Sequence, residues 1–284
     1  MTEGDTNSSH PFLEGEIVVR STQDNTRHSI QRSALQKSEV FDGMFTVCEP
    51  SARPALELNE SGAHLELLIR LLNGSLARPT SLGEEEAPER RSRYPKKLFD
   101  EATMIPFPML QVMYRLADKY IIATGDSLRP HLRAHYADEA LGVYALACKL
   151  GENDIAADAS QFLRPIESYS ANEIAALPDA RAVHTLVTLQ SQRRRALTRL
   201  VLSEDVFPHG YGACAAHQDQ TLALWDERRK RLSASVDADT DIAWEMDGGR
   251  QDVGCATCDL AWGRAVAMLA YKSRKAISRT DQLQ

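Results

Sequence analysis

The sequence has no uninterrupted apolar run long enough to cross a membrane. Its least polar long stretch runs from Val253 to Tyr271, and the charged residues Asp259 and Arg264 interrupt it, so we expect a packed helix there. The opening residues, MTEGDTNSSH, lack the basic start and apolar run of a secretory signal. These absences favour an intracellular protein, in the cytoplasm or the nucleus, with no membrane partner.

Basic residues are in the minority, with 33 Lys and Arg against 40 Asp and Glu and a formal net charge of −7. This balance argues against nonspecific nucleic-acid binding by the whole chain, although it does not exclude a local basic face. Two basic clusters, RRR at 193–195 and ERRKRL at 227–232, fall on expected amphipathic helices. They are interpreted as solvated helix faces or, alternatively, as a nuclear-import or acidic-partner patch.

Familiar catalytic motifs are missing. The sequence contains no G-x-S-x-G, H-E-x-x-H or P-loop pattern. The stretch GYGACA, residues 210–215, matches G-x-G-x-x-A, but Phe207, Pro208 and His209 precede it where a dinucleotide site requires a strand. The residues therefore give no positive evidence for an enzyme.

Hydrophobic periodicity divides the 284 residues into a mixed N-terminal part and a helical remainder, which predicts an α+β fold. Residues 1–13 are polar and predict a disordered tail. A hairpin is expected over 16–31, a third strand at ALELNE, and a helix from Ala63. Residues 79–104 are rich in charge, Pro and Gly and predict an exposed insertion. From Pro108 onward nearly every segment has helical spacing.

The stretch HSIQRSALQKSEVFDGMF, residues 28–45, passes quickly from a strand pattern to a helix with large apolar side chains. We expect Val40, Phe41, Met44 and Phe45 to pack under the sheet as core. Ser38 is expected to support the tight geometry between two short helices.

Several segments in order along the chain resemble the BTB/POZ domain. The stretch 28–45 is similar to its signature, F-x-x-H-[RK]-x-x-L-x-x-x-S-x-[VF]-F-x-x-M-F, although Arg27 lies near the position of the first Phe. The other matching segments are EIVVRS, ALELNE, HLELLIRLLNGSL and LQVMYRLADKYII. The resemblance assigns residues 14–125 to a BTB/POZ domain that contains the charged insertion. VYALACKLGENDIAADASQFL and the C-terminal cysteine elements resemble fungal-type members, which implies helical regions at 126–205 and 206–284.

The resemblance implies a protein–protein interaction module and not an enzyme. Within the family it implies either a substrate adaptor for cullin-based ubiquitin ligation or a scaffold for transcriptional regulators, with other proteins as partners. Self-association stays open, but residues 1–13 are too short and polar for the extra helix of strand-exchanged dimers. A DNA-binding regulator using the basic helices is a third hypothesis, which the acidic net charge disfavours.

Five cysteines without an export signal fit a reducing compartment, where metal binding or burial replaces disulfide formation. Cys214-x-x-His217 and Cys255-x-x-Cys258 are two pairs of metal-ligand spacing, 37 residues apart. Together they can surround one tetrahedral zinc, and four protein ligands make that zinc structural. A zinc-dependent enzyme would require an open ligand position and a base. For the three cysteines of this set, the alternative is simple burial as small apolar residues. We expect such burial for Cys48 and Cys148.

Overall fold

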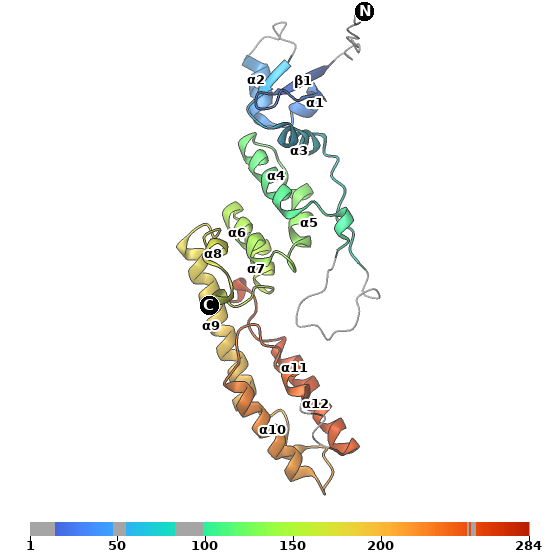
Figure 1. Ribbon diagram of the computed structural model, residues 1–284, viewed down its shortest axis with the longest axis vertical. Helices are drawn as coiled ribbons and strands as arrows, with labels where there is room; N and C mark the ends of the chain where they lie inside the picture. Colours follow the sequence, from blue (N-terminus) through green and yellow to red (C-terminus); the bar gives the residue numbers. More distant parts are fainter. Residues whose placement is uncertain (1–14, 48–54, 83–98, 249, 251–253, 284) are drawn as a thin grey trace, which may run out of the picture. The chain divides into compact units, whose positions relative to one another are not determined.

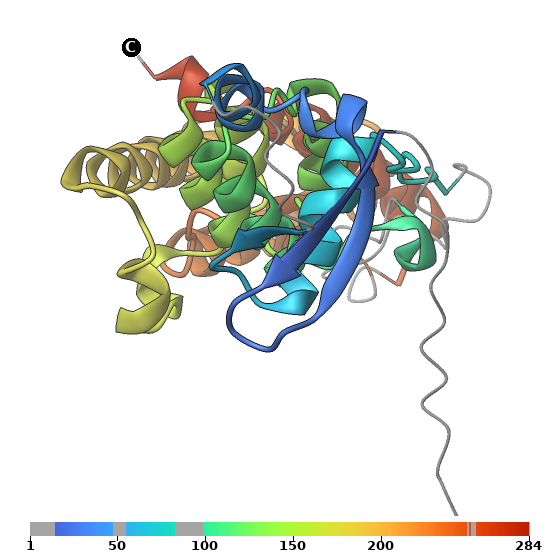
Figure 2. The same cartoon turned by 90° about the horizontal axis from the view of Figure 1, so that it is seen from above.

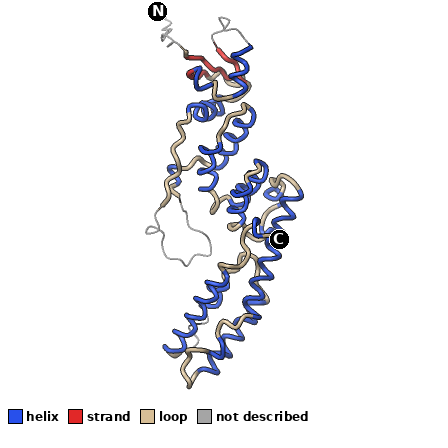
Figure 3. The backbone as a smooth tube through the Cα atoms, turned by 180° about the vertical axis from the view of Figure 1, so that it is seen from behind, coloured by secondary structure: helices blue, strands red, loops and turns tan. Residues whose placement is uncertain are grey.

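The computed structural model describes residues 15–47, 55–82, 99–248, 250 and 254–283 of the chain. The fold is α+β, as predicted, and in the described part every strand lies near the N-terminus (Figure 3). Two compact units are present: the first comprises the described residues up to 80 together with 99–134, and the second contains 135–283. The predicted tail at 1–13, Cys48 and most of the predicted insertion lie outside the described residues.

A three-stranded sheet organises the first unit (Figure 2). The central strand, β1 (Glu16–Ser21), pairs antiparallel with β2 (Arg27–Gln31) and parallel with β3 (Ala55–Leu58). The predicted hairpin and third strand are therefore confirmed. Asn25 closes the hairpin with a φ of 62°, a left-handed conformation that Asn tolerates in turns.

The Asp24 carboxylate ties this hairpin turn to α3 (Gly62–Asn73). It accepts hydrogen bonds from the Thr26 hydroxyl at 2.6 Å, the Gly62 N–H at 2.7 Å and the Thr26 N–H at 3.0 Å. These bonds, with the hydroxyl contributing most, hold the pKa of Asp24 well below its usual value. A Cβ at Gly62 would lie 2.5 Å from the Thr26 hydroxyl oxygen, so glycine is required for this close approach.

The short helices α1 (Arg32–Leu35) and α2 (Glu39–Val47) follow β2. The prediction that all four large apolar residues of α2 are core is wrong. Phe41 is buried and stacks on Tyr120 with ring centroids 5.1 Å apart, but Val40 is 40% exposed, and Met44 and Phe45 are partly exposed. Successive helix positions differ by about 100° in direction, so a helix that meets the core along one narrow face buries only one of two neighbours.

Ser38 joins the start of α2 to the end of α4 (Phe107–Lys119). Its buried hydroxyl donates to the Tyr120 carbonyl at 2.5 Å and accepts from the Phe41 N–H at 3.3 Å. Ile121 follows with a φ of 47°, an uncommon conformation for a β-branched residue, and its carbonyl accepts the Glu39 N–H. Ile121 lies beyond the end of α4 and its side chain is exposed. The unit ends with α5 (Gly125–Ala134).

The second unit is helical, in agreement with the predicted pattern (Figure 1). Its helices, in chain order, are α6 (Ala140–Leu150), α7 (Asn153–Ser160), α8 (Ala171–Ile174), α9 (Ala180–Ser203), α10 (Gln218–Ser233), α11 (Ile242–Asp247) and α12 (Ala256–Ser273). Its C-terminal part packs around Trp225 and Trp262, whose rings meet edge to face at 4.9 Å. The Trp262 indole N–H donates to the Met246 carbonyl at 3.0 Å. Of the helices in the described chain, none combines the length and apolar character needed to span a membrane.

The turn η6 (Thr280–Gln282) returns to the last turn of α7. The Arg279 guanidinium lies 2.8 Å from the Asp158 carboxylate, and the Thr280 N–H donates to the Ser160 hydroxyl at 3.1 Å. These contacts join α7 and η6, two segments of the second unit that are distant in the sequence.

Candidate metal centre

A tight loop between α9 and α10 presents Cys214 and His217. Gly210 and Gly212 adopt left-handed φ values of 68° and 87°, and a Cβ at Gly212 would also lie 3.4 Å from the Cβ of Ala261. The His217 N–H donates to the Cys214 carbonyl at 3.1 Å, and His217 is the N-cap of α10. This turn brings the thiol and the imidazole to the same side of the loop.

The other pair occupies the beginning of α12. Cys255 is the N-cap of this helix and Cys258 lies in its first turn, three residues further on. Gly254, with a φ of 62°, turns the chain into the helix. Cys258 is fully buried in the core that contains Trp262, so the packing of α12 fixes its position.

Electrostatics at this helix start favour a thiolate. The backbone N–H of Cys258 contributes most, and His217, Cys214 and the Thr257 N–H add to it, so that the pKa of Cys255 falls to about 6. The pKa of Cys214 is raised instead, first by its removal from water and then by the neighbouring thiols of Cys258 and Cys255. Three sulfur atoms this close cannot all carry charge without a cation among them.

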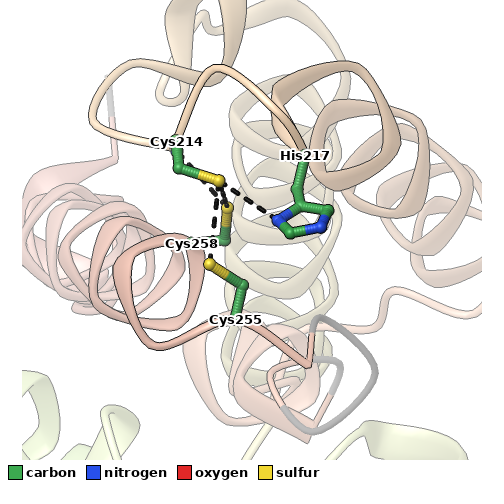
Figure 4. Close-up of side chains that lie close together, drawn as sticks. All are labelled: Cys214, His217, Cys255 and Cys258. Atoms are coloured by element: carbon green, nitrogen blue, oxygen red, sulfur yellow. Dashed lines mark hydrogen bonds between the residues drawn. The ribbon is translucent and has the colours of Figure 1, made fainter.

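The four side chains converge on one point (Figure 4). The Cys214 Sγ lies 3.1 Å from His217 Nδ1 and 3.7 Å from both Cys255 Sγ and Cys258 Sγ, and all four ligand atoms lie within 4.8 Å of one another. A tetrahedral zinc site, with Zn–S of about 2.3 Å and Zn–N of about 2.0 Å, has edges of about 3.8 Å between sulfurs and about 3.5 Å between sulfur and nitrogen. A disulfide would require sulfurs about 2.05 Å apart. The cluster therefore has nearly the dimensions of a metal coordination shell and could hold a metal ion.

A second layer of contacts orients the ligands. The Cys214 N–H donates to the Cys258 Sγ at 3.4 Å, which links the loop to α12. Asp259, the residue after Cys258, forms an ion pair with Arg250 at 2.8 Å, which ties the first turn of α12 to the residues before it. Such outer contacts hold metal ligands in their binding orientation before the ion arrives.

The four predicted ligands are thus brought together, from two elements separated by α10 and α11. Cys148 lies elsewhere, on α6, where it is partly buried and where burial raises the pKa of its thiol. Gly210, Gly212 and Gly254 were not predicted to belong to the metal centre. Glycine beside each Cys pair was the available signal, because a ligand loop needs conformations that other residues rarely adopt.

The chain was also compared with known proteins. It matches no protein-family model, and no curated protein matches it significantly. Functional conclusions about this chain consequently depend on its own residues and geometry.

Proposed function

We propose that this chain is a protein–protein interaction module with a BTB/POZ-type first unit and a structural zinc in its second unit. The element order of the first unit carries the proposal: a hairpin, two short helices, a strand parallel to β1, α3, and the pair α4 and α5. This is the order that the sequence resemblance implies. The buried hydroxyl of Ser38 at the centre of the signature supports the same assignment.

The chemistry of the metal centre favours a structural role. Three thiols and one imidazole suit zinc, and four protein ligands fill a tetrahedral shell. No position is then left for the water or substrate that a zinc enzyme must bind. The ion instead joins the start of α12 to the loop before α10, close to the tryptophan core.

Metal analysis tests the zinc site. We expect about one equivalent of zinc per chain by mass spectrometry of purified protein. Cys258→Ser and Cys255→Ser should lose most of it, and Cys148→Ser, which removes a thiol outside the centre, should retain it. Zinc well below one equivalent in the unaltered protein, or an equal zinc content in all three variants, would refute the assignment.

For the first unit we propose an adaptor role toward a cullin scaffold. Two exposed apolar residues of α2, Val40 and Val47, support it, together with Ile121, whose carbonyl bonds the residue before Val40. Apolar side chains left exposed on a folded unit are typical of binding surfaces.

Titration with the purified N-terminal domain of each cullin tests this role. The Val40→Glu/Val47→Glu variant should lose binding, whereas Ser75→Glu, at an exposed position after α3, should not. If the unaltered protein binds no cullin, the adaptor role is wrong. The zinc assignment would be unaffected, because it is measured on the other unit.

A further inference from the structure

The C-terminal half of α9 carries arginines that pair with no carboxylate of the described residues. Arg194, Arg195 and Arg199 are exposed, and none of them forms an ion pair with a residue that the structure describes. Arg195, Arg199 and Leu202 follow one another at i, i+4 and i+7, so they lie on the same helix face. Leu202 is 46% exposed beside these cations.

Two adjoining hollows border this face. One, of about 320 Å³, is lined by Arg194, Arg195, Thr198, Arg199, Leu202 and Ser203. The second, of about 420 Å³, shares Arg199 and extends to Lys272, in the last turn of α12, and to Lys275, just after that helix, over an apolar floor that includes Ala196 and Leu200. We call this continuous surface the basic groove and define it by Arg194, Arg195, Arg199, Leu202, Lys272 and Lys275.

The charge of the basic groove is opposite to that of the whole chain. Glu204 is the one carboxylate among its lining residues, and Lys272 already pairs with it. Lys275 lies 4.3 Å from the ring centroid of Tyr271, which leaves its charge unneutralised. In a chain with a formal net charge of −7, four cations that have no carboxylate partner among the residues with described positions lie on one surface.

We propose that the basic groove binds an acidic segment of a partner protein in which apolar side chains alternate with carboxylates. The arginine guanidinium groups can form bidentate hydrogen bonds with carboxylates of such a segment. The exposed Leu202 and the apolar floor of Ala196 and Leu200 can contact its apolar side chains. Nucleic-acid interfaces are more polar and more positively charged than protein–protein interfaces, whereas this groove has an apolar floor, and the net negative charge of the chain opposes a long polyanion. The groove lies wholly in the second unit, so this inference does not depend on the cullin-adaptor role.

Fluorescence anisotropy with the full chain tests the proposal. The probe is a labelled peptide of Glu-Glu-Leu repeats, compared with the same peptide carrying Gln for Glu and with a labelled DNA duplex. The protein should bind the acidic peptide best, and added salt should weaken the binding. Arg194→Glu/Arg195→Glu/Arg199→Glu should weaken binding at least about tenfold, since three charge contacts become repulsive.

The matched control is Arg181→Glu/Lys230→Glu/Arg231→Glu, which makes the same change in net charge at exposed positions outside the groove. It should change the affinity by less than about threefold. A milder variant, Arg194→Gln/Arg195→Gln/Arg199→Gln, removes the charge without reversing it and guards against misfolding. Failure of the protein to bind the acidic peptide, equal weakening by groove and control variants, or tighter binding of DNA would each overturn the proposal.

Discussion

Replacing Ser38 with alanine would test how the first unit holds its two short helices against α4. The buried hydroxyl serves two backbone groups, the Tyr120 carbonyl at 2.5 Å and the Phe41 N–H at 3.3 Å. Alanine removes one atom and leaves the carbonyl buried without this donor, which costs about 1–3 kcal/mol. Loss of the longer hydrogen bond from the Phe41 N–H adds a smaller amount to this cost in unfolding free energy. We therefore expect Ser38→Ala to lose about 2 kcal/mol of unfolding free energy.

The assay must separate the two units, and the positions of the tryptophans allow this. Trp225, Trp244 and Trp262 all belong to the second unit, so tryptophan fluorescence in urea follows that unit alone. Hydrogen exchange of the backbone amides in α2 and at the end of α4 follows the first unit. A loss of about 2 kcal/mol corresponds to a roughly 30-fold fall in protection. The urea midpoint of tryptophan fluorescence should stay unchanged.

Ser33→Ala provides the control, because Ser33 is an exposed serine of the neighbouring helix α1. It should change stability by less than about 0.5 kcal/mol. If the amides of α2 and of the end of α4 are as well protected from hydrogen exchange in Ser38→Ala as in Ser33→Ala, the hydroxyl of Ser38 does not hold the helices together. A matching shift in tryptophan fluorescence would show that the two units do not unfold separately.

Three further substitutions probe other contacts. Phe41→Ala should cost about 3–5 kcal/mol, because it removes a buried ring stacked on Tyr120, and hydrogen exchange of the first unit measures the loss. The Asp24 carboxylate has a lowered pKa, so its stabilisation is complete above pH 4 or so and lost as the pH falls further; Asp24→Asn should flatten this part of the pH profile of first-unit exchange. Trp262→Phe removes the indole donor to the Met246 carbonyl, which then keeps only the Gly248 N–H, and it should lower the second unit's urea stability, followed by the fluorescence of Trp225 and Trp244, by about 1–3 kcal/mol.

Local patterns in the sequence were sufficient to predict the elements of the first unit. The hairpin depends on a β-branched run and an adjacent turn, which lie within a few residues of each other. The burial of α2 could not be predicted in the same way. Val40 and Phe41 are both large and apolar, and only the position of Tyr120, far along the chain, decides that Phe41 is the one enclosed.

The metal centre could be predicted from local sequence patterns, whereas the basic groove could not. Each half of the metal centre has a spacing of ligands that local geometry dictates, so the four residues could be predicted before their distances were known. The RRR cluster was also evident in the sequence. Arg193, however, is partly buried and interacts with Asp239, and the groove needs Lys272 and Lys275 from another helix. No local signal relates those lysines to α9.

The contact between η6 and α7 cannot form during translation until Arg279 and Thr280 have been synthesised. Thr280 is made 120 residues after Ser160, its partner in this contact. At about 5–20 residues per second, α7 leaves the ribosome roughly 6 to 24 seconds before Arg279 can neutralise Asp158. All residues of the contact between Ser38 and Tyr120 have been synthesised by then, so the first unit can fold while the second still lacks the residues that bond α7.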